Sequence, residues 1–227
     1  MRLAVFCDKA FCPFILGEHG DFTKDDEMSL EVGVYRLFDG NADNGGRGIM
    51  YSQQRNHKGH SYLDEMSFVR AWWYLIHTAC NNPSSQDHGL VYVVDPRNVK
   101  LSRFDAEVVP RMLKEIHLFP ITLHSIHFCH PGIYFDSLYS GLAAIKEPGI
   151  SLHSHIGSVE VVAGRLEQFG IPKRSILRDL GGELNLEEFT SAWIGYSVPK
   201  VFDENSVNNK RHNKRGLNQK LMAFAYF

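Results

Sequence analysis

Apolar and polar positions follow two different periods along the middle of the chain. The apolar residues of 64–80 are spaced by three or four positions, which predicts a helix with one buried face. Residues 90–94 form an uninterrupted apolar run, which predicts a strand buried on both faces of a sheet. The same two periods continue as far as residue 169, with helices expected over 108–116 and 158–169 and strands over 123–128 and 152–156.

This alternation of strands and helices predicts an α/β domain, because parallel strands need crossover helices that pack on the sheet. Upstream, the strand-like residues 32–38 and 48–52 flank turn residues and predict a hairpin leading into the domain. We therefore expect one domain over 32–190, between an unassigned N-terminal segment, 1–31, and a C-terminal tail, 191–227. The tail is basic and rich in Asn, which predicts that it is flexible.

The composition is that of an ordinary globular protein, with 44% hydrophobic and 22% charged residues. A formal net charge of -2 over 227 residues supplies no general attraction to nucleic acid, which is not an expected partner. The four cysteines form no C-x-x-C pair, and charged residues interrupt the apolar N-terminus before it could form the core of a signal peptide. These features favour a cytoplasmic protein.

Residues 133–145 are apolar on several sides of a predicted helix. Phe135, Leu138 and Leu142 share one face, whereas Tyr134 and Ile145 lie elsewhere around the helix. A helix with this distribution is either deeply buried in a core or in contact with a second apolar partner, such as a ligand or a bilayer. The pattern by itself leaves both interpretations open.

Six short motifs follow one another between residues 44 and 182. They read Asn44-Gly-Gly-Arg-Gly-Ile-Met, Gly89-Leu-Val-Tyr-Val-Val-Asp, Phe119-Pro, Ile126-His-Phe-Cys-His-Pro, Leu152-His-Ser-His-Ile-Gly-Ser and Leu177-Arg-Asp-Leu-Gly-Gly. In this order and spacing they resemble the motifs of the CRAL-TRIO domain, the fold of phosphatidylinositol and α-tocopherol transfer proteins. The resemblance implies a mixed, largely parallel sheet flanked by helices, with an apolar pocket closed by a gate helix.

The resemblance also implies which residues contact a lipid. Carried over by position, the gate helix covers 134–145 and presents Tyr134, Phe135, Leu138, Tyr139, Leu142 and Ile145. The other implied contacts are Val69, Trp72 and Ile76 on the preceding helix, and Leu90, Tyr92, Val94, Ile126 and Phe128 on two strands. The strand positions alternate, as side chains on one face of a sheet must.

Two positions depart from the phosphoinositide-transfer members of the family. Those members carry a Glu after the Tyr-Pro motif and a Lys at the start of the later strand, and the pair holds the inositol phosphate. In this chain the two positions are Ile121 and Leu152. We therefore do not expect phosphatidylinositol as the ligand. The helical subdomain that normally precedes the family's domain is not recognisable in 1–31.

Histidines are concentrated on the predicted strands and raise the alternative of a hydrolase. Strand alternation puts His153 and His155 on one face, where a neighbouring residue could complete a metal site. Cys129 beside His127 is a second candidate, but side chains on one strand face point in parallel and rarely hydrogen-bond well. Motifs of serine hydrolases, zinc proteases and nucleotide-binding loops are missing from the sequence. We therefore expect no catalytic residue, no metal ligand and no cofactor.

The sequence thus predicts a lipid carrier and not an enzyme. Such a carrier binds a hydrophobic small molecule or lipid, associates transiently with a membrane surface, and transfers its ligand between membranes. Two alternatives stay open: a metal- or cysteine-dependent hydrolase, and a degenerate domain that serves only to bind other proteins.

Overall fold

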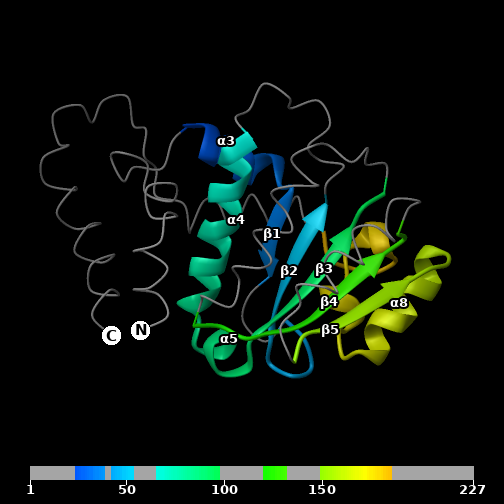
Figure 1. Cartoon of the computed structure of the whole chain (residues 1–227). Coiled ribbons are helices and arrows are strands. Elements are labelled where there is room, and N and C mark those ends of the chain that lie inside the picture. Colours follow the sequence, from blue (N-terminus) through cyan, green and yellow to red (C-terminus); the bar gives the residue numbers. More distant parts are fainter. Residues whose placement is uncertain (1–23, 39–41, 54–64, 98–119, 132–148, 186–227) are drawn as a thin grey trace, which may run out of the picture.

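A mixed β-sheet forms the centre of the described part of the chain (Figure 1). The computed structural model describes residues 24–38, 42–53, 65–97, 120–131 and 149–185. The strands follow the order β1-β2-β3-β4-β5 across the sheet, and their bounds are β1 Tyr35–Phe38, β2 Gly48–Gln53, β3 Leu90–Asp95, β4 Leu123–Cys129 and β5 Ser151–His155. The first pair is antiparallel and the remaining pairs are parallel. The predicted α/β class, the largely parallel sheet and the hairpin are confirmed.

Helices cover both faces of this sheet, with α4 on one side and α8 on the other (Figure 1). The described helices are α3 Lys24–Val32, α4 Glu65–Cys80, α5 Pro83–His88 and α8 Val159–Gln168, followed by the short 3-10 turns η4 Lys173–Ser175 and η5 Arg178–Leu180. The side chains of each strand alternate between the two faces, so each strand contributes to two separate cores. We call these faces the α4 face and the α8 face.

The core on the α4 face is built from large apolar side chains. Trp72 and Trp73 are fully buried and pack edge to face, with ring centroids 5.1 Å apart. They belong to one cluster with Leu90, Tyr92 and Phe128 of the sheet. Rings of this size bury 150–250 Å² each, so α4 contributes a large share of the hydrophobic stabilisation.

The core on the α8 face is smaller and contains more polar groups. Val162 and Leu166 of α8 pack with Val91 and Val93 of β3. The hydroxyl of Tyr51 donates a hydrogen bond to the carbonyl of Ser175, which ties the segment after α8 to the sheet. Burial raises the pKa of Tyr51, because the phenolate would be poorly solvated there.

Local signals explain where two of the helices begin. The Asn82 side chain accepts hydrogen bonds from the backbone N–H groups of Ser84 and Ser85, which caps α5. The Ser158 hydroxyl accepts a bond from the Val161 N–H at 3.5 Å and caps α8. The Gly170 position after α8 has a φ of +88°, as expected at a helix C-terminus. The predicted limits of this helix are therefore confirmed.

Most of the predicted elements are present, with three differences. The strand expected from residue 32 begins at Tyr35, because α3 extends to Val32 and Gly33 turns the chain with a φ of +68°. The helix α3 itself lies mostly within 1–31, where no element is predicted. The short helix α5 is also not predicted. The helices expected over 108–116 and 133–145 lie outside the described residues.

The described helices do not include one that is both long enough and apolar enough to cross a membrane.

Candidate functional site

The strand residues expected to contact a lipid do share one face of the sheet. Tyr92 pairs with Ile126 and Val94 pairs with Phe128 in the parallel register of β3 and β4. These four side chains and Leu90 belong to the same core cluster on the α4 face. All five are buried, and Val94, at 9%, is the most exposed of them. Strand alternation therefore predicted correctly which side chains lie together.

The α4 residues of the expected site lie over the same strands. Val69, Trp72 and Ile76 are buried in the cluster that contains the five strand residues. The Tyr92 hydroxyl makes side-chain hydrogen bonds with Ser52 and Trp72, and burial raises its pKa. The polar tip of Tyr92 is thus satisfied within an otherwise apolar surface.

The eight described site residues therefore form one continuous apolar layer between α4 and the sheet. The gate residues Tyr134, Phe135, Leu138, Tyr139, Leu142 and Ile145 lie outside the described residues. That any of these residues contacts a lipid stays a prediction.

Apolar side chains occupy the two positions where phosphoinositide-transfer members carry a charged pair. Ile121 is buried in the core of the α4 face. Leu152 is partly buried and packs against the same core. Neither side chain can donate a hydrogen bond or offer a charge to a phosphate group.

Three histidines form a stack on the opposite, α8 face. The ring of His127 on β4 stacks against those of His153 and His155 on β5, with centroids 4.9 and 5.2 Å away, and the two β5 rings are 6.4 Å apart. The ring of Phe169 packs against all three imidazoles. The prediction that His153 and His155 share a face is confirmed. Among the described residues, however, no group of three or more His, Cys, Asp or Glu has the arrangement of a metal site.

A chain of hydrogen bonds runs through this stack. Ser125 Oγ lies 2.8 Å from His127 Nε2, and His127 Nδ1 lies 2.9 Å from His155 Nε2. The connectivity is that of a serine nucleophile, a base and an orienting group. Burial, followed by the positive charge on neighbouring imidazoles, lowers the pKa of His127 to about 3. An imidazole that resists protonation this strongly is a poor general base at neutral pH.

The cysteine candidate lacks the environment that activates a thiol. Cys129 is fully buried. Burial, and secondarily the negative charge of Asp95, raise its pKa. A nucleophilic cysteine needs a stabilised thiolate and access to a substrate. The surroundings of Cys129 favour a structural role.

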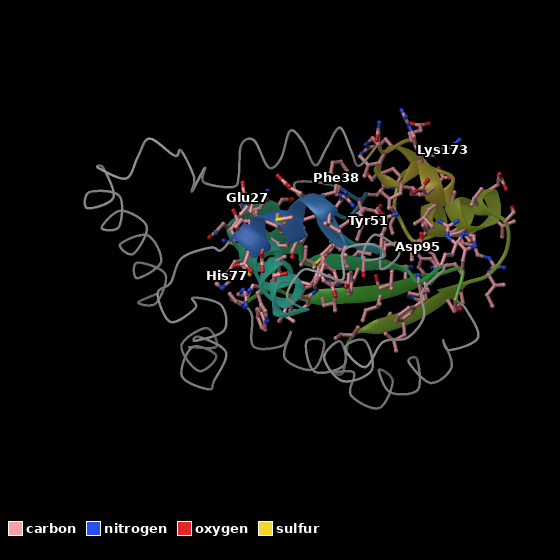
Figure 2. All side chains as sticks on the ribbon, turned by 90° about the horizontal axis from the view of Figure 1, so that it is seen from above. Glu27, Phe38, Tyr51, His77, Asp95 and Lys173 are labelled. Atoms are coloured by element: carbon pink, nitrogen blue, oxygen red, sulfur yellow. The ribbon has the colours of Figure 1, made fainter. Side chains whose placement is uncertain are left out.

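A polar cluster lies at the carboxyl end of the parallel strands. The Asp95 carboxylate, at the end of β3, accepts hydrogen bonds from Arg97 Nε and Nη2, each 2.8 Å long. Arg97 Nη2 also donates to the carbonyl of Asp179. His130 follows β4 in the same region and interacts electrostatically with Asp95 and Arg97. In Figure 2, Asp95 lies on the opposite side of the molecule from Glu27 of α3 and His77 of α4.

Sequence reasoning missed this cluster. Asp95 and His130 each come directly after an expected strand, and parallel strands end at one edge of a sheet, where ligands of open α/β folds bind. That rule was the available signal. The pairing of Asp95 with Arg97 and its proximity to His130 depend on the loops, which a periodicity does not describe.

Comparison with known proteins now decides the family. Residues 35–182 match the model of the CRAL/TRIO domain, which is well over half of the chain. The chain belongs to the CRAL/TRIO family. CRAL/TRIO domains bind small lipophilic ligands, and the proteins that contain them are generally lipid-binding transfer proteins and not enzymes.

Solved structures with a similar fold exist, whereas a search of the curated proteins finds no match. One of them is described as the crystal structure of Sfh5, with a TM-score of 0.48 and 15% sequence identity. The alignment covers 72% of this chain and 58% of that one, so this chain spans less than two thirds of that protein's length.

Proposed function

We propose that this CRAL/TRIO domain binds a hydrophobic small molecule or lipid and carries it between membranes. The observation that supports this most directly is the continuous apolar layer on the α4 face, to which alternating residues of β3 and β4 and the helix α4 contribute. Burial of a lipid chain contributes about 0.8 kcal/mol per methylene, so an apolar surface of this kind can hold a lipid without polar contacts.

The proposed gate helix would close this layer. The strands β4 and β5 are parallel neighbours, so the chain between them must cross one face of the sheet. The connection from β2 to β3 includes α4 and therefore crosses the α4 face. The step from β2 to β3 goes in the same direction across the sheet as the step from β4 to β5. If the connection between β4 and β5 has the same handedness as the one between β2 and β3, it would also run over the α4 face. Residues 134–145 would then cover the ligand.

Exchange of the ligand requires that the gate moves. A buried lipid is held too strongly for simple dissociation to be fast, and a mobile element can expose it at a bilayer. The carrier would then associate transiently with the membrane surface during loading and release. We assign no catalytic residue, because the serine, histidine and cysteine candidates are buried and poorly suited to proton transfer or nucleophilic attack.

The ligand class follows from the same surface. Ile121 and Leu152 offer no charge to a phosphorylated inositol, so the carrier would prefer neutral lipophiles over phosphatidylinositol. In a competition experiment, vesicles that contain phosphatidylinositol should not displace a bound neutral lipid.

Native mass spectrometry followed by organic extraction tests the proposal. We expect one lipophilic molecule per chain, and transfer of a fluorescent neutral lipid between donor and acceptor vesicles. The variant Leu138→Asp places a charge on the proposed gate and should abolish both lipid retention and transfer. Ile156→Asp is the matched control, because Ile156 is 67% exposed and lies beyond the end of β5.

The outcomes separate the proposal from its alternatives. A folded protein that retains no lipid and transfers none would favour a module that binds other proteins. Equal loss of transfer in the two variants would argue against 134–145 as the gate. Circular dichroism of both variants establishes that each is folded.

A further inference from the structure

His130 has the most unusual backbone among the described residues. It is the one non-glycine residue there with a positive φ, +52°, and it directly precedes Pro131. A left-handed conformation is unfavourable for a residue with a side chain, and a following proline restricts the backbone further towards extended values. Strain of this kind persists where the surrounding structure holds a side chain in a particular place, and it is common at binding sites.

The imidazole of His130 is oriented through one of its two nitrogens. A backbone hydrogen bond with Gly157 favours the protonated ring, so in this bond the ring donates to a carbonyl oxygen. The other nitrogen, Nε2, is buried and has no hydrogen-bond partner among the described residues. The bond to Gly157 is therefore made by Nδ1–H, which leaves Nε2 as an acceptor in the neutral ring.

The charges around His130 keep this acceptor available. Burial, followed by the positive charge of Arg97, lowers the pKa of His130, and the opposing contributions come from Asp95 and the Gly157 bond. The ring is therefore neutral at physiological pH. Arg97 does not bond to Nε2: its Nε and Nη2 groups donate to the Asp95 carboxylate and the Asp179 carbonyl. A buried acceptor without a donor costs about 1–3 kcal/mol.

The position of His130 relates this acceptor to the apolar layer. His130 follows β4 directly and lies two residues beyond Phe128, which pairs with Val94. Phe128 and Val94 are the last residues of the apolar layer before the carboxyl end of the strands. A ligand that lies along this layer would bring one of its ends to the edge of the sheet where His130 is placed.

We propose that His130 Nε2 accepts a hydrogen bond from the polar end of the ligand, and that the carrier selects lipophiles with a hydroxyl group. The inference rests on the proposed function, because it concerns the polar end of the same ligand. It adds a selective contact that the apolar residues cannot provide, since an apolar surface does not distinguish an alcohol from an ether of the same size.

Matched ligands test this contact. The probes are saturated long-chain alcohols and their methyl ethers, which have nearly the same apolar surface but differ in the donor. Wild-type protein should bind the alcohol about fivefold to tenfold more tightly than the ether, which is the effect of one neutral hydrogen bond. Displacement of a fluorescent fatty-chain probe measures both affinities.

A variant that keeps the backbone but removes Nε2 sharpens the test. Asn tolerates the left-handed conformation, and its amide can still donate to the Gly157 carbonyl in place of Nδ1–H. His130→Asn should therefore bind the ether with wild-type affinity and lose the preference for the alcohol. His130→Gln, whose longer side chain returns a carbonyl oxygen near the place of Nε2, should recover part of that preference.

Each result leads to a distinct conclusion. Equal affinity of the wild type for alcohol and ether would overturn the proposal, and Nε2 would then be satisfied by water or by another part of the chain. A stronger preference for a fatty acid anion over the alcohol would overturn it as well, because an anion needs a donor. If neither alcohol nor ether binds, the proposed function itself fails. If His130→Asn does not fold, the wild-type preference still decides between the first two outcomes.

Discussion

The two faces of the sheet use the same strands for different chemistry. On the α4 face, β3 and β4 present Leu90, Tyr92, Val94, Ile126 and Phe128, and the covering helix adds two tryptophans. On the α8 face, the alternate residues of β3 to β5 include Asp95, Cys129 and three stacked histidines. Because successive side chains on a strand point to opposite faces, the proposed ligand surface and a titratable structural core can be separated by one residue.

Histidines that are concentrated on neighbouring strands can serve the packing of a core. On the α8 face, His127 and His155 are buried, neutral and hydrogen-bonded to each other, and the partly buried His153 stacks against them. Satisfied polar groups of this kind specify how strands pack, and they make stability depend on pH. The predictions below separate a structural role of the α8 face from a ligand-binding role of the α4 face.

The largest expected effect is a loss of stability on the α8 face. Leu166 is fully buried against the sheet, and Leu166→Ala should lower the free energy of unfolding by about 2–5 kcal/mol through lost burial and a cavity. Urea denaturation measures this loss. The lipid content per folded molecule should stay unchanged. A fall in lipid content would mean that the two faces do not act separately.

A smaller truncation on the α4 face should affect both stability and ligand binding. Val94→Ala removes two methyl groups and should lower the free energy of unfolding by about 2 kcal/mol. Because Val94 belongs to the expected ligand surface, the stabilisation by added lipid should decrease as well. Thermal denaturation with and without lipid measures both effects. An unchanged ligand-dependent shift in Tm would remove Val94 from the site.

Acid should destabilise the α8 face selectively. Burial lowers the pKa of His127 to about 3 and that of His155 to about 4, and the positive charges of Arg47 and Arg165 add to the respective shifts. Below the ordinary histidine pKa of about 6.5, the unfolded chain therefore binds more protons than the folded protein. The stability that comes from keeping His127 and His155 neutral should be fully present above that pH and should be lost progressively as the pH falls towards 4.

The variant His155→Gln tests the origin of this acid dependence. Gln can still hydrogen-bond to His127 but does not titrate. The decline in unfolding free energy below about pH 6.5 should therefore become shallower by about 1 kcal/mol per pH unit. Urea unfolding at a series of pH values measures the slope. An identical slope in the variant would assign the acid sensitivity to other groups.

The smallest expected effect concerns the start of α8. Ser158→Ala removes the side-chain acceptor of the Val161 N–H and should cost about 0.5–1 kcal/mol. Ser158→Thr keeps the acceptor and should retain most of the stability. A cost as large as that of Leu166→Ala would mean that Ser158 does more than cap the helix.

Much of the described fold could be predicted because its signals are local. The apolar run 90–94 predicts β3, the spacing of three and four predicts α4, and Ser158 with Gly170 predicts both ends of α8. The segment before Tyr35 could not be predicted in the same way. The helix α3 has little amphipathic pattern, and Asp26 on it is held by Arg70 of α4 at 2.6 Å. That contact joins residues 44 positions apart and leaves no periodic signal.

The sequence by itself determined the strands, the main helices and the family, because hydrophobic periodicity and short motifs act over a few residues. It also determined which strand residues share the α4 face, because alternation is a property of every strand. Only the tertiary structure decided that the histidines of β4 and β5 bond to each other and that His130 keeps a free acceptor beside Asp95 and Arg97. These relations depend on strand register and loop conformation, which bring together residues far apart in the sequence.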